Sequence, residues 1–177
     1  MILEGTGSLV LDRKNNAVFA IESERTNRIL FERYCDEMKV PSSNRIFFHA
    51  NDENGVPIYH TNVIMSIGNG FAVICSECIE SRERREVMTK LEELRLEIID
   101  ISYAQLKNFC GNILNVKNTN GDTLIVLSAS AMWNFEDRQV EILQKYGRLV
   151  EVSINTIETV GGGSARCMMA EIFLQKK

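Results

Sequence analysis

The chain repeats one pattern of secondary structure three times, and this repeat restricts the possible folds more than any other feature of the sequence. Each unit starts with two apolar runs joined by a polar or glycine-rich turn, which predicts a β-hairpin. We expect hairpins at 9–21, 63–75 and 113–127. Units that recur at a spacing of about fifty residues are typical of repeat or propeller-like assemblies.

A helical pattern follows each hairpin and leads into one more strand. Apolar residues recur at helical spacing within 26–38, 81–94 and 136–146. The strands that follow are expected at 44–49, 96–101 and 148–154. The unit is therefore strand, strand, helix, strand (ββαβ), and the fold class is α/β. A last strand is expected at 169–174, with no helix after it.

We expect residues 1–177 to form a single partial domain. Its repeats run roughly over 5–58, 59–108 and 109–155, and 156–177 is a closing segment. A ring of so few units leaves sheet edges exposed that a larger ring would cover. The sequence therefore favours a truncated product, or a polypeptide that needs neighbours.

Composition narrows the class of protein. The chain is 45% hydrophobic and 25% charged, and no run reaches the roughly 18 apolar residues of a membrane span. Its net charge of −4 argues against a nucleic-acid partner. The five cysteines, without a secretory leader, favour reduced thiols and a cytoplasmic location.

Two short motifs resemble metal-binding or phosphate-binding motifs, but both are incomplete. Cys75 and Cys78 have CxxC spacing, but no second CxxC or nearby histidine completes a zinc site, so we interpret them as core cysteines. The glycines at 161–163 lack the Lys-Ser/Thr pair that follows a phosphate loop. We therefore expect no metal site and no cofactor.

The glycine-rich segment at 161–163 is followed by Cys167. Glycines permit backbone conformations that other residues resist, so this segment suits a turn that presents a thiol to a ligand. His60 is one of only two histidines. A cysteine and a histidine far apart in sequence are typical of enzymes with a cysteine nucleophile. A buried cysteine and a structural loop histidine are the alternative interpretation.

Five short segments resemble, in their order, those of the guanidino-modifying enzymes, the pentein superfamily. This superfamily includes amidinotransferases, arginine deiminases and dimethylarginine hydrolases. The segments are 4–8 (EGTGS), 52–55 (DENG), 59–63 (YHTNV), 110–114 (CGNIL) and 156–167 (TIETVGGGSARC). The arginine-deiminase-related or citrulline-utilisation branch is the most similar. The resemblance implies a five-bladed ββαβ propeller, of which this chain carries about three blades from the C-terminal part.

The resemblance also implies roles for individual residues. Cys167 matches the nucleophile, His60 the general acid/base, and Glu4 the carboxylate that orients the histidine and helps to hold the guanidinium. Asn62 matches a substrate-binding position at which several relatives carry aspartate. Arg166, beside the nucleophile, is a second candidate substrate-binding residue. We interpret Asn112 and His49 as structural.

The function implied is conversion of arginine or a related guanidino compound to a ureido product through a covalent amidino-thioether. An amidinotransferase would pass the amidino group to an amine instead of water, and the sequence does not separate the two. The alternative from another class is an inactive remnant or assembly module. It would form a homo-oligomer or require a complementary N-terminal chain.

Overall fold

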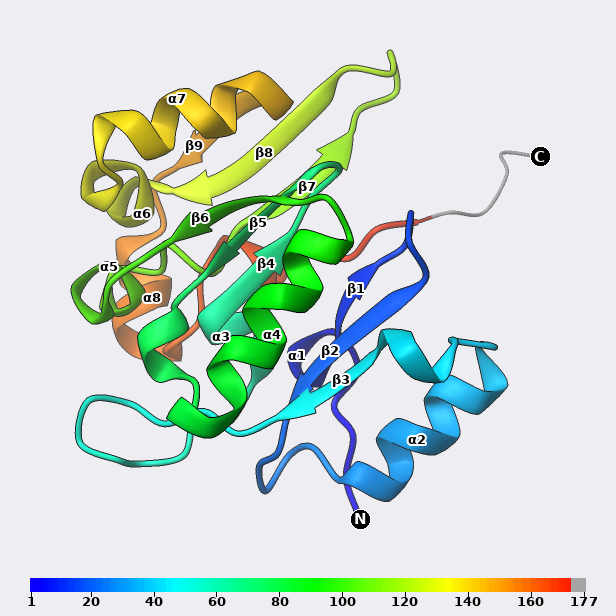
Figure 1. Cartoon of the computed structure of the whole chain (residues 1–177). Helices are drawn as coiled ribbons and strands as arrows, with labels where there is room; N and C mark the ends of the chain where they lie inside the picture. Colours follow the sequence, from blue (N-terminus) through cyan, green and yellow to red (C-terminus); the bar gives the residue numbers. More distant parts are fainter. Residues whose placement is uncertain (173–177) are drawn as a thin grey trace.

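The computed structural model describes residues 1–172, and its strands form three separate three-stranded sheets (Figure 1). The strands are β1 (Val10–Asp12), β2 (Ala17–Ile21), β3 (Arg45–Phe48), β4 (Met65–Ile67), β5 (Phe71–Ile74), β6 (Glu97–Asp100), β7 (Leu114–Lys117), β8 (Thr123–Ser128) and β9 (Arg148–Val152). In every sheet the first pair of strands is antiparallel and the second pair is parallel. The predicted ββαβ unit is confirmed.

A helix makes the crossover before the parallel strand of each unit. These helices are α2 (Arg28–Glu37), α4 (Ser81–Glu93) and α7 (Asp137–Tyr146), and each lies within its predicted segment. Local side chains fix where they begin. The Asn27 side chain accepts hydrogen bonds from the backbone N–H groups of Ile29 and Leu30 at the start of α2. Glu136 and Gln139 form a capping box at the start of α7.

The sequence does not predict the shorter helices, because three to seven residues carry too little periodicity to be recognised. They are α1 (Gly5–Ser8), α3 (Thr61–Ile64), α5 (Tyr103–Lys107), α6 (Ala129–Asn134), α8 (Asn155–Gly161) and the 3₁₀ helices η1 (Ser42–Asn44), η2 (Ser76–Cys78) and η3 (Ala165–Met168). Two strand predictions need correction. The strand expected from residue 63 begins at Met65, after α3. Residues 169–172 form no strand, and the rest of that prediction lies outside the described residues.

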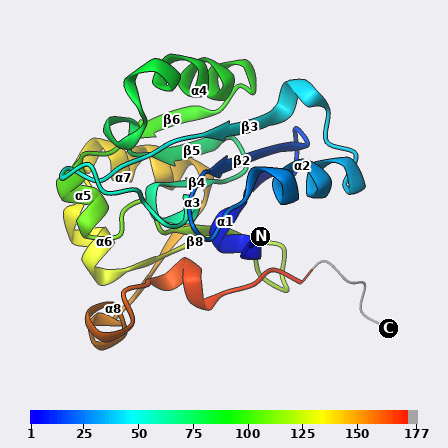
Figure 2. The same cartoon turned by 90° about the horizontal axis from the view of Figure 1, so that it is seen from below.

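The first strands of the three units lie beside one another, with β1 against β4 and β4 against β7. The main core is continuous across the units and includes Phe19, Phe71, Ile74 and Ile125, all at most 1% exposed. A smaller cluster around Phe31 packs α2 on the first sheet. Figure 2 shows α4 and α8 on opposite faces of the molecule.

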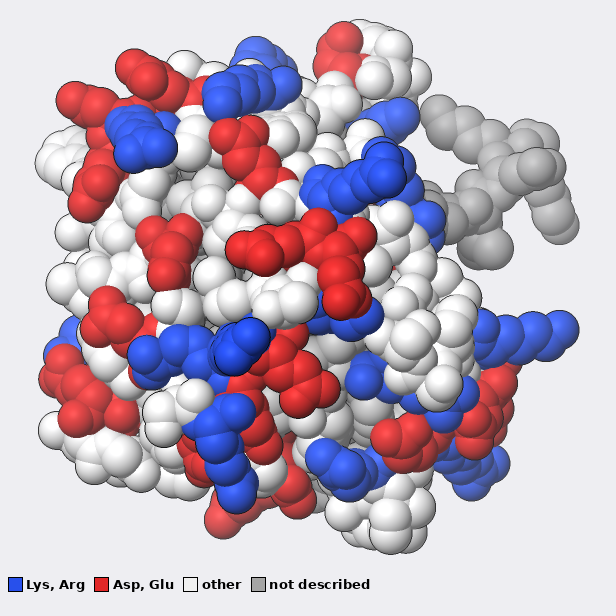
Figure 3. All heavy atoms as spheres, in the orientation of Figure 1, with Lys and Arg blue, Asp and Glu red and all other residues white. Residues whose placement is uncertain are grey.

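The surface in Figure 3 carries acidic and basic side chains interleaved. At the start of α4, Arg82 pairs with Glu80 at 3.0 Å, and the Arg82 side chain is 70% exposed, so this pair lies on a solvated face. Within residues 1–172, no helix combines the length and the apolar character needed to cross a membrane.

Candidate active site

His60 lies directly before α3 and forms a hydrogen bond with Glu4, with His60 Nε2 at 2.7 Å from Glu4 Oε2. The His60 side chain is only 16% exposed, whereas that of Glu4 is 40% exposed. A carboxylate that bonds to one imidazole nitrogen fixes the orientation of the ring. The structure therefore brings together these two predicted residues, which are 56 positions apart in the chain.

Backbone contacts on both sides fix this pair. The buried Thr61 hydroxyl donates to Ser8 O at 2.6 Å and accepts from Ile21 N–H at 2.9 Å, which holds α3 against α1 and β2. The Ser8 hydroxyl accepts from the Glu4 N–H at 2.9 Å. Gly7 lies against the imidazole so closely that an added Cβ would stand 2.7 Å from His60 Cε1. A residue with a side chain at position 7 would displace the ring.

Cys167 lies in η3, directly after the glycine-rich segment, and is exposed. This segment differs from the turn we expected, because α8 extends through Gly161. The chain reverses at Gly162, whose φ of 68° ends that helix. The Tyr59 hydroxyl donates to Gly162 O at 3.4 Å, so the loop before Cys167 adjoins the residue that precedes His60.

Two asparagine amides converge on the sulfur. Asn62 Nδ2 lies 3.8 Å and Asn112 Nδ2 lies 3.2 Å from Cys167 Sγ. Asn112 Nδ2 also donates to Asn62 O at 3.0 Å, which fixes the two loops to one another. Amide N–H groups directed at sulfur stabilise negative charge that develops on it. Both asparagines are 3% exposed.

Arg166 is turned away from solvent, although it is adjacent to the exposed Cys167. It is 9% exposed, and its Nη1 donates to Ile113 O at 3.5 Å. Burial lowers the pKa of its guanidinium from the ordinary value, while Cys167 and Glu171 oppose that change. The residue also lines a cavity of about 910 Å³ beside β1 and β7. Arg166, a candidate substrate-binding residue, therefore lies at the wall of this cavity.

The remaining cysteines are buried, as expected for Cys75 and Cys78. Burial raises the pKa of Cys35 to about 11 and that of Cys110 to about 12. A hydrogen bond between Cys75 and Cys78 lowers the pKa of Cys75 and raises that of Cys78. Cys167 is thus the exposed thiol within the described part of the chain.

The chain matches a known protein family over nearly its whole length. A family model described as eukaryotic N,N-dimethylarginine dimethylhydrolase matches residues 1–174. The chain belongs to this family. The match confirms the resemblance to the guanidino-modifying superfamily, and no curated protein matched the sequence.

Solved structures show the same fold as this dimethylarginine dimethylhydrolase family member. ArgZ, an arginine dihydrolase from cyanobacteria, superposes with a TM-score of 0.72 at 17% identity over 93% of this chain and 24% of ArgZ. AgrE with ornithine and NAD⁺ gives 0.70 at 20% identity over 93% of this chain and 22% of AgrE. The N-terminal domain of ArgZ, covalently bound to a reaction intermediate, gives 0.70 at 17% identity. The chain spans 54% of that domain.

Asn112, interpreted from the sequence as structural, also lies beside the candidate nucleophile. Its amide does bond to backbone, as expected, but it also contacts Cys167. The available signal was its presence in the CGNIL segment, one of those that carried the resemblance to the family. A contact between loops 55 residues apart leaves no periodic trace in the sequence.

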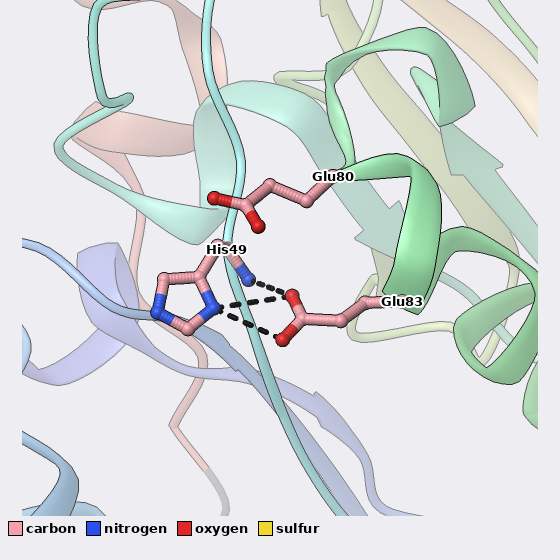
Figure 4. A group of neighbouring side chains, drawn as sticks. All are labelled: His49, Glu80 and Glu83. Carbon is pink, nitrogen blue, oxygen red and sulfur yellow. Dashed lines mark hydrogen bonds and ion pairs between the residues drawn. The ribbon is translucent and has the colours of Figure 1, made fainter.

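A second polar cluster lies at the start of α4, where His49, Glu80 and Glu83 point toward one another (Figure 4). Their potential ligand atoms lie within 4.8 Å of one another. His49 Nδ1 contacts Glu83 at 3.1 Å, and its Nε2 contacts Glu22 at 3.0 Å. Because both ring nitrogens already have carboxylate partners, the cluster is a hydrogen-bonded contact that joins the end of β3 to the start of α4.

Proposed function

We propose that this member of the dimethylarginine dimethylhydrolase family is a hydrolase of guanidino compounds that uses Cys167 as its nucleophile. One observation carries the proposal: the only exposed cysteine of the described residues adjoins the Glu4–His60 pair through the Asn62 and Tyr59 contacts. The substrate is arginine or an arginine methylated on its guanidinium, the class that the family description indicates. Reaction with water gives a ureido product and an amine or ammonia.

In the first step, the Cys167 thiolate attacks the guanidinium carbon and forms a C–S bond. His60, protonated and oriented by Glu4, donates its proton to the departing nitrogen as the C–N bond breaks. The product of this step is an amidino-thioether on Cys167, with the amine released. A covalent intermediate divides one difficult displacement into two easier ones.

In the second step, neutral His60 removes a proton from water, and the resulting hydroxide attacks the amidino carbon. The C–S bond then breaks and the electron pair returns to sulfur, which restores the thiolate. Asn62 and Asn112 donate to that sulfur when it carries charge. The proton left on the new oxygen passes to the released amine or ammonia, so atoms and protons balance over the two steps.

The same residues suit a cationic substrate. Glu4 supplies a negative charge, and Arg25 approaches it at 3.6 Å from one side. Asn62 Oδ1 is buried and accepts no hydrogen bond within the described residues, so it is suited to accept one from a guanidinium N–H. An amide carries no negative charge, so Asn62 contributes less to binding a cation than an aspartate would.

We further propose that the three ββαβ units are blades of a five-bladed propeller, with boundaries near 5–58, 59–108 and 109–155. The unit topology and the fold similarity to ArgZ support this arrangement. The chain spans 24% of ArgZ. We therefore assign the proposed activity to this chain together with any further copies or chains that supply the other blades of the propeller.

The test is product formation from arginine and from methylated arginines, with the ureido product measured by mass spectrometry. We expect product from the wild-type chain and none above the blank from Cys167→Ala or His60→Ala. Residual turnover in Cys167→Ala would exclude Cys167 as the nucleophile. Formation of an amidinated amine when glycine is added, without ureido product, would identify an amidinotransferase instead.

A further inference from the structure

A buried carboxylate lies in the helix that leads to the glycine-rich segment. Glu158 is in α8 and is 7% exposed. Its Oε1 accepts from the Ser164 hydroxyl at 2.7 Å, and its Oε2 accepts from the Ser130 hydroxyl at 2.6 Å. One side chain therefore connects three segments: α8, α6 and the residue that begins the turn around Cys167.

Ser164 transmits this connection to the nucleophile. Its side chain is buried against Glu158, and its carbonyl accepts the Cys167 N–H at 3.0 Å. The turn from Ser164 to Cys167 is therefore fixed at its start by the carboxylate and closed by its own backbone hydrogen bond. Ser130, on α6, anchors the carboxylate to the third unit.

The carboxylate is charged at neutral pH. Burial raises its pKa, but hydrogen bonds from Ser130, Ser128 and Ser164 together lower the pKa below the ordinary value of 4.5. A buried ion with several hydroxyl donors holds those donors more strongly than a neutral acceptor does. A charge of this kind is costly to bury merely for stability, since apolar side chains of similar volume pack as well.

We propose that Glu158 is a positioning residue for Cys167: through Ser164 it fixes the turn that sets the direction from which the sulfur approaches a guanidinium carbon. The inference rests on the proposed role of Cys167 as nucleophile. A thiol on a loosened turn still reacts with a small freely diffusing electrophile. It reacts more slowly with an electrophile that is bound in a fixed orientation, because displacement of the sulfur by about 1 Å can lower the rate about a hundredfold.

The test compares Glu158→Ala, Glu158→Gln, Ser164→Ala and the exposed control Thr156→Ala on the same helix. Two readouts are needed. Amide hydrogen exchange at 164–168 reports the turn itself, independent of any activity. The ratio of Cys167 labelling by 2-chloroacetamidine, a guanidinium mimic, to labelling by iodoacetamide reports the orientation of the sulfur. Loss of stability alone would not change that ratio in the folded protein.

We expect faster exchange at 164–168 and a ratio lowered by about tenfold in Glu158→Ala and Ser164→Ala. Glu158→Gln, which keeps one acceptor oxygen and adds a donor, should recover most of the ratio. The inference would be overturned if both alanine variants kept the hydrogen-exchange rate at 164–168 and the labelling ratio of the wild type. If Glu158→Ala does not fold, Ser164→Ala alone decides the test. If the wild type shows no preference for chloroacetamidine, the proposed function fails, and hydrogen exchange still decides whether Glu158 holds the turn.

Discussion

The Asn112 amide lies 3.2 Å from Cys167 Sγ, and the same nitrogen donates to the backbone carbonyl of Asn62. Asn112 lies just before β7 of the third unit. Its side chain therefore connects that segment to α3, which follows His60, and to the candidate nucleophile Cys167. The relationship explains how residues from three loops meet at one sulfur atom. It also makes Asn112 testable as part of the site.

We predict that Asn112→Ala lowers the rate of ureido product formation by about tenfold, because a donor to the developing thiolate is lost. Asn112→Asp should be worse, since it places a negative charge beside the sulfur. The matched control is Asn120→Ala, an exposed residue of the turn between β7 and β8. Equal rates in Asn112→Ala and Asn120→Ala would show that the amide is structural only.

Gly7→Ala should inactivate the enzyme without unfolding it. The new Cβ would stand 2.7 Å from His60 Cε1, so the imidazole must leave its position beside Glu4 or the backbone must shift. We expect a loss of about a hundredfold in turnover, as for other displacements of a catalytic group by about 1 Å. Turnover and circular dichroism of Gly7→Ala are compared with those of Gly161→Ala, whose nearest neighbour is 3.8 Å away. Full activity in Gly7→Ala would contradict the placement of His60.

Cys167 should account for nearly all thiol labelling of the folded protein at neutral pH. With pKa values of about 11 and about 12, Cys35 and Cys110 are protonated, and only about one thiol in ten thousand of the former is thiolate. In Cys167→Ser, iodoacetamide labelling measured by intact mass should be more than about tenfold slower. Unchanged labelling would mean that the buried cysteines are accessible.

Glu158 should make stability depend on pH in the acid range. Because its pKa is lower in the folded state than its ordinary 4.5, the unfolded chain binds the proton more tightly. Its contribution is therefore complete above the unfolded pKa and is lost as the pH falls through the folded one. We predict that the difference in urea midpoint between wild type and Glu158→Gln shrinks as the pH is lowered from neutral to below 4.5. A difference independent of pH would refute this.

The sequence predicted the repeating unit well, because hairpin turns and helical stripes are local signals. The strand 17–21 and the helices around Ile29, Val87 and Leu143 were found at or close to their observed bounds. The short helices that position the site were missed. Four residues of α1 or α3 show no period, yet these segments place Glu4 and His60 against one another.

The parts of the site that could not be predicted depend on long-range packing. The burial of Arg166 and the hydrogen bonds of Glu158 to two separate segments follow from tertiary contacts, not from local pattern. Cys167 and His60 were candidates from the cysteine–histidine pattern itself, whereas Glu4 and Asn62 came from the resemblance to a family. The chemical roles of all four stay predictions until they are measured.

The most direct test is intact mass and peptide mapping after incubation with 2-chloroacetamidine. We predict one adduct, located on Cys167, that is slowed by arginine and lost in His60→Ala. Equal, slow labelling spread over all five cysteines, with no protection by arginine, would contradict the proposal that Cys167 and His60 form a guanidine-recognising active site in this chain.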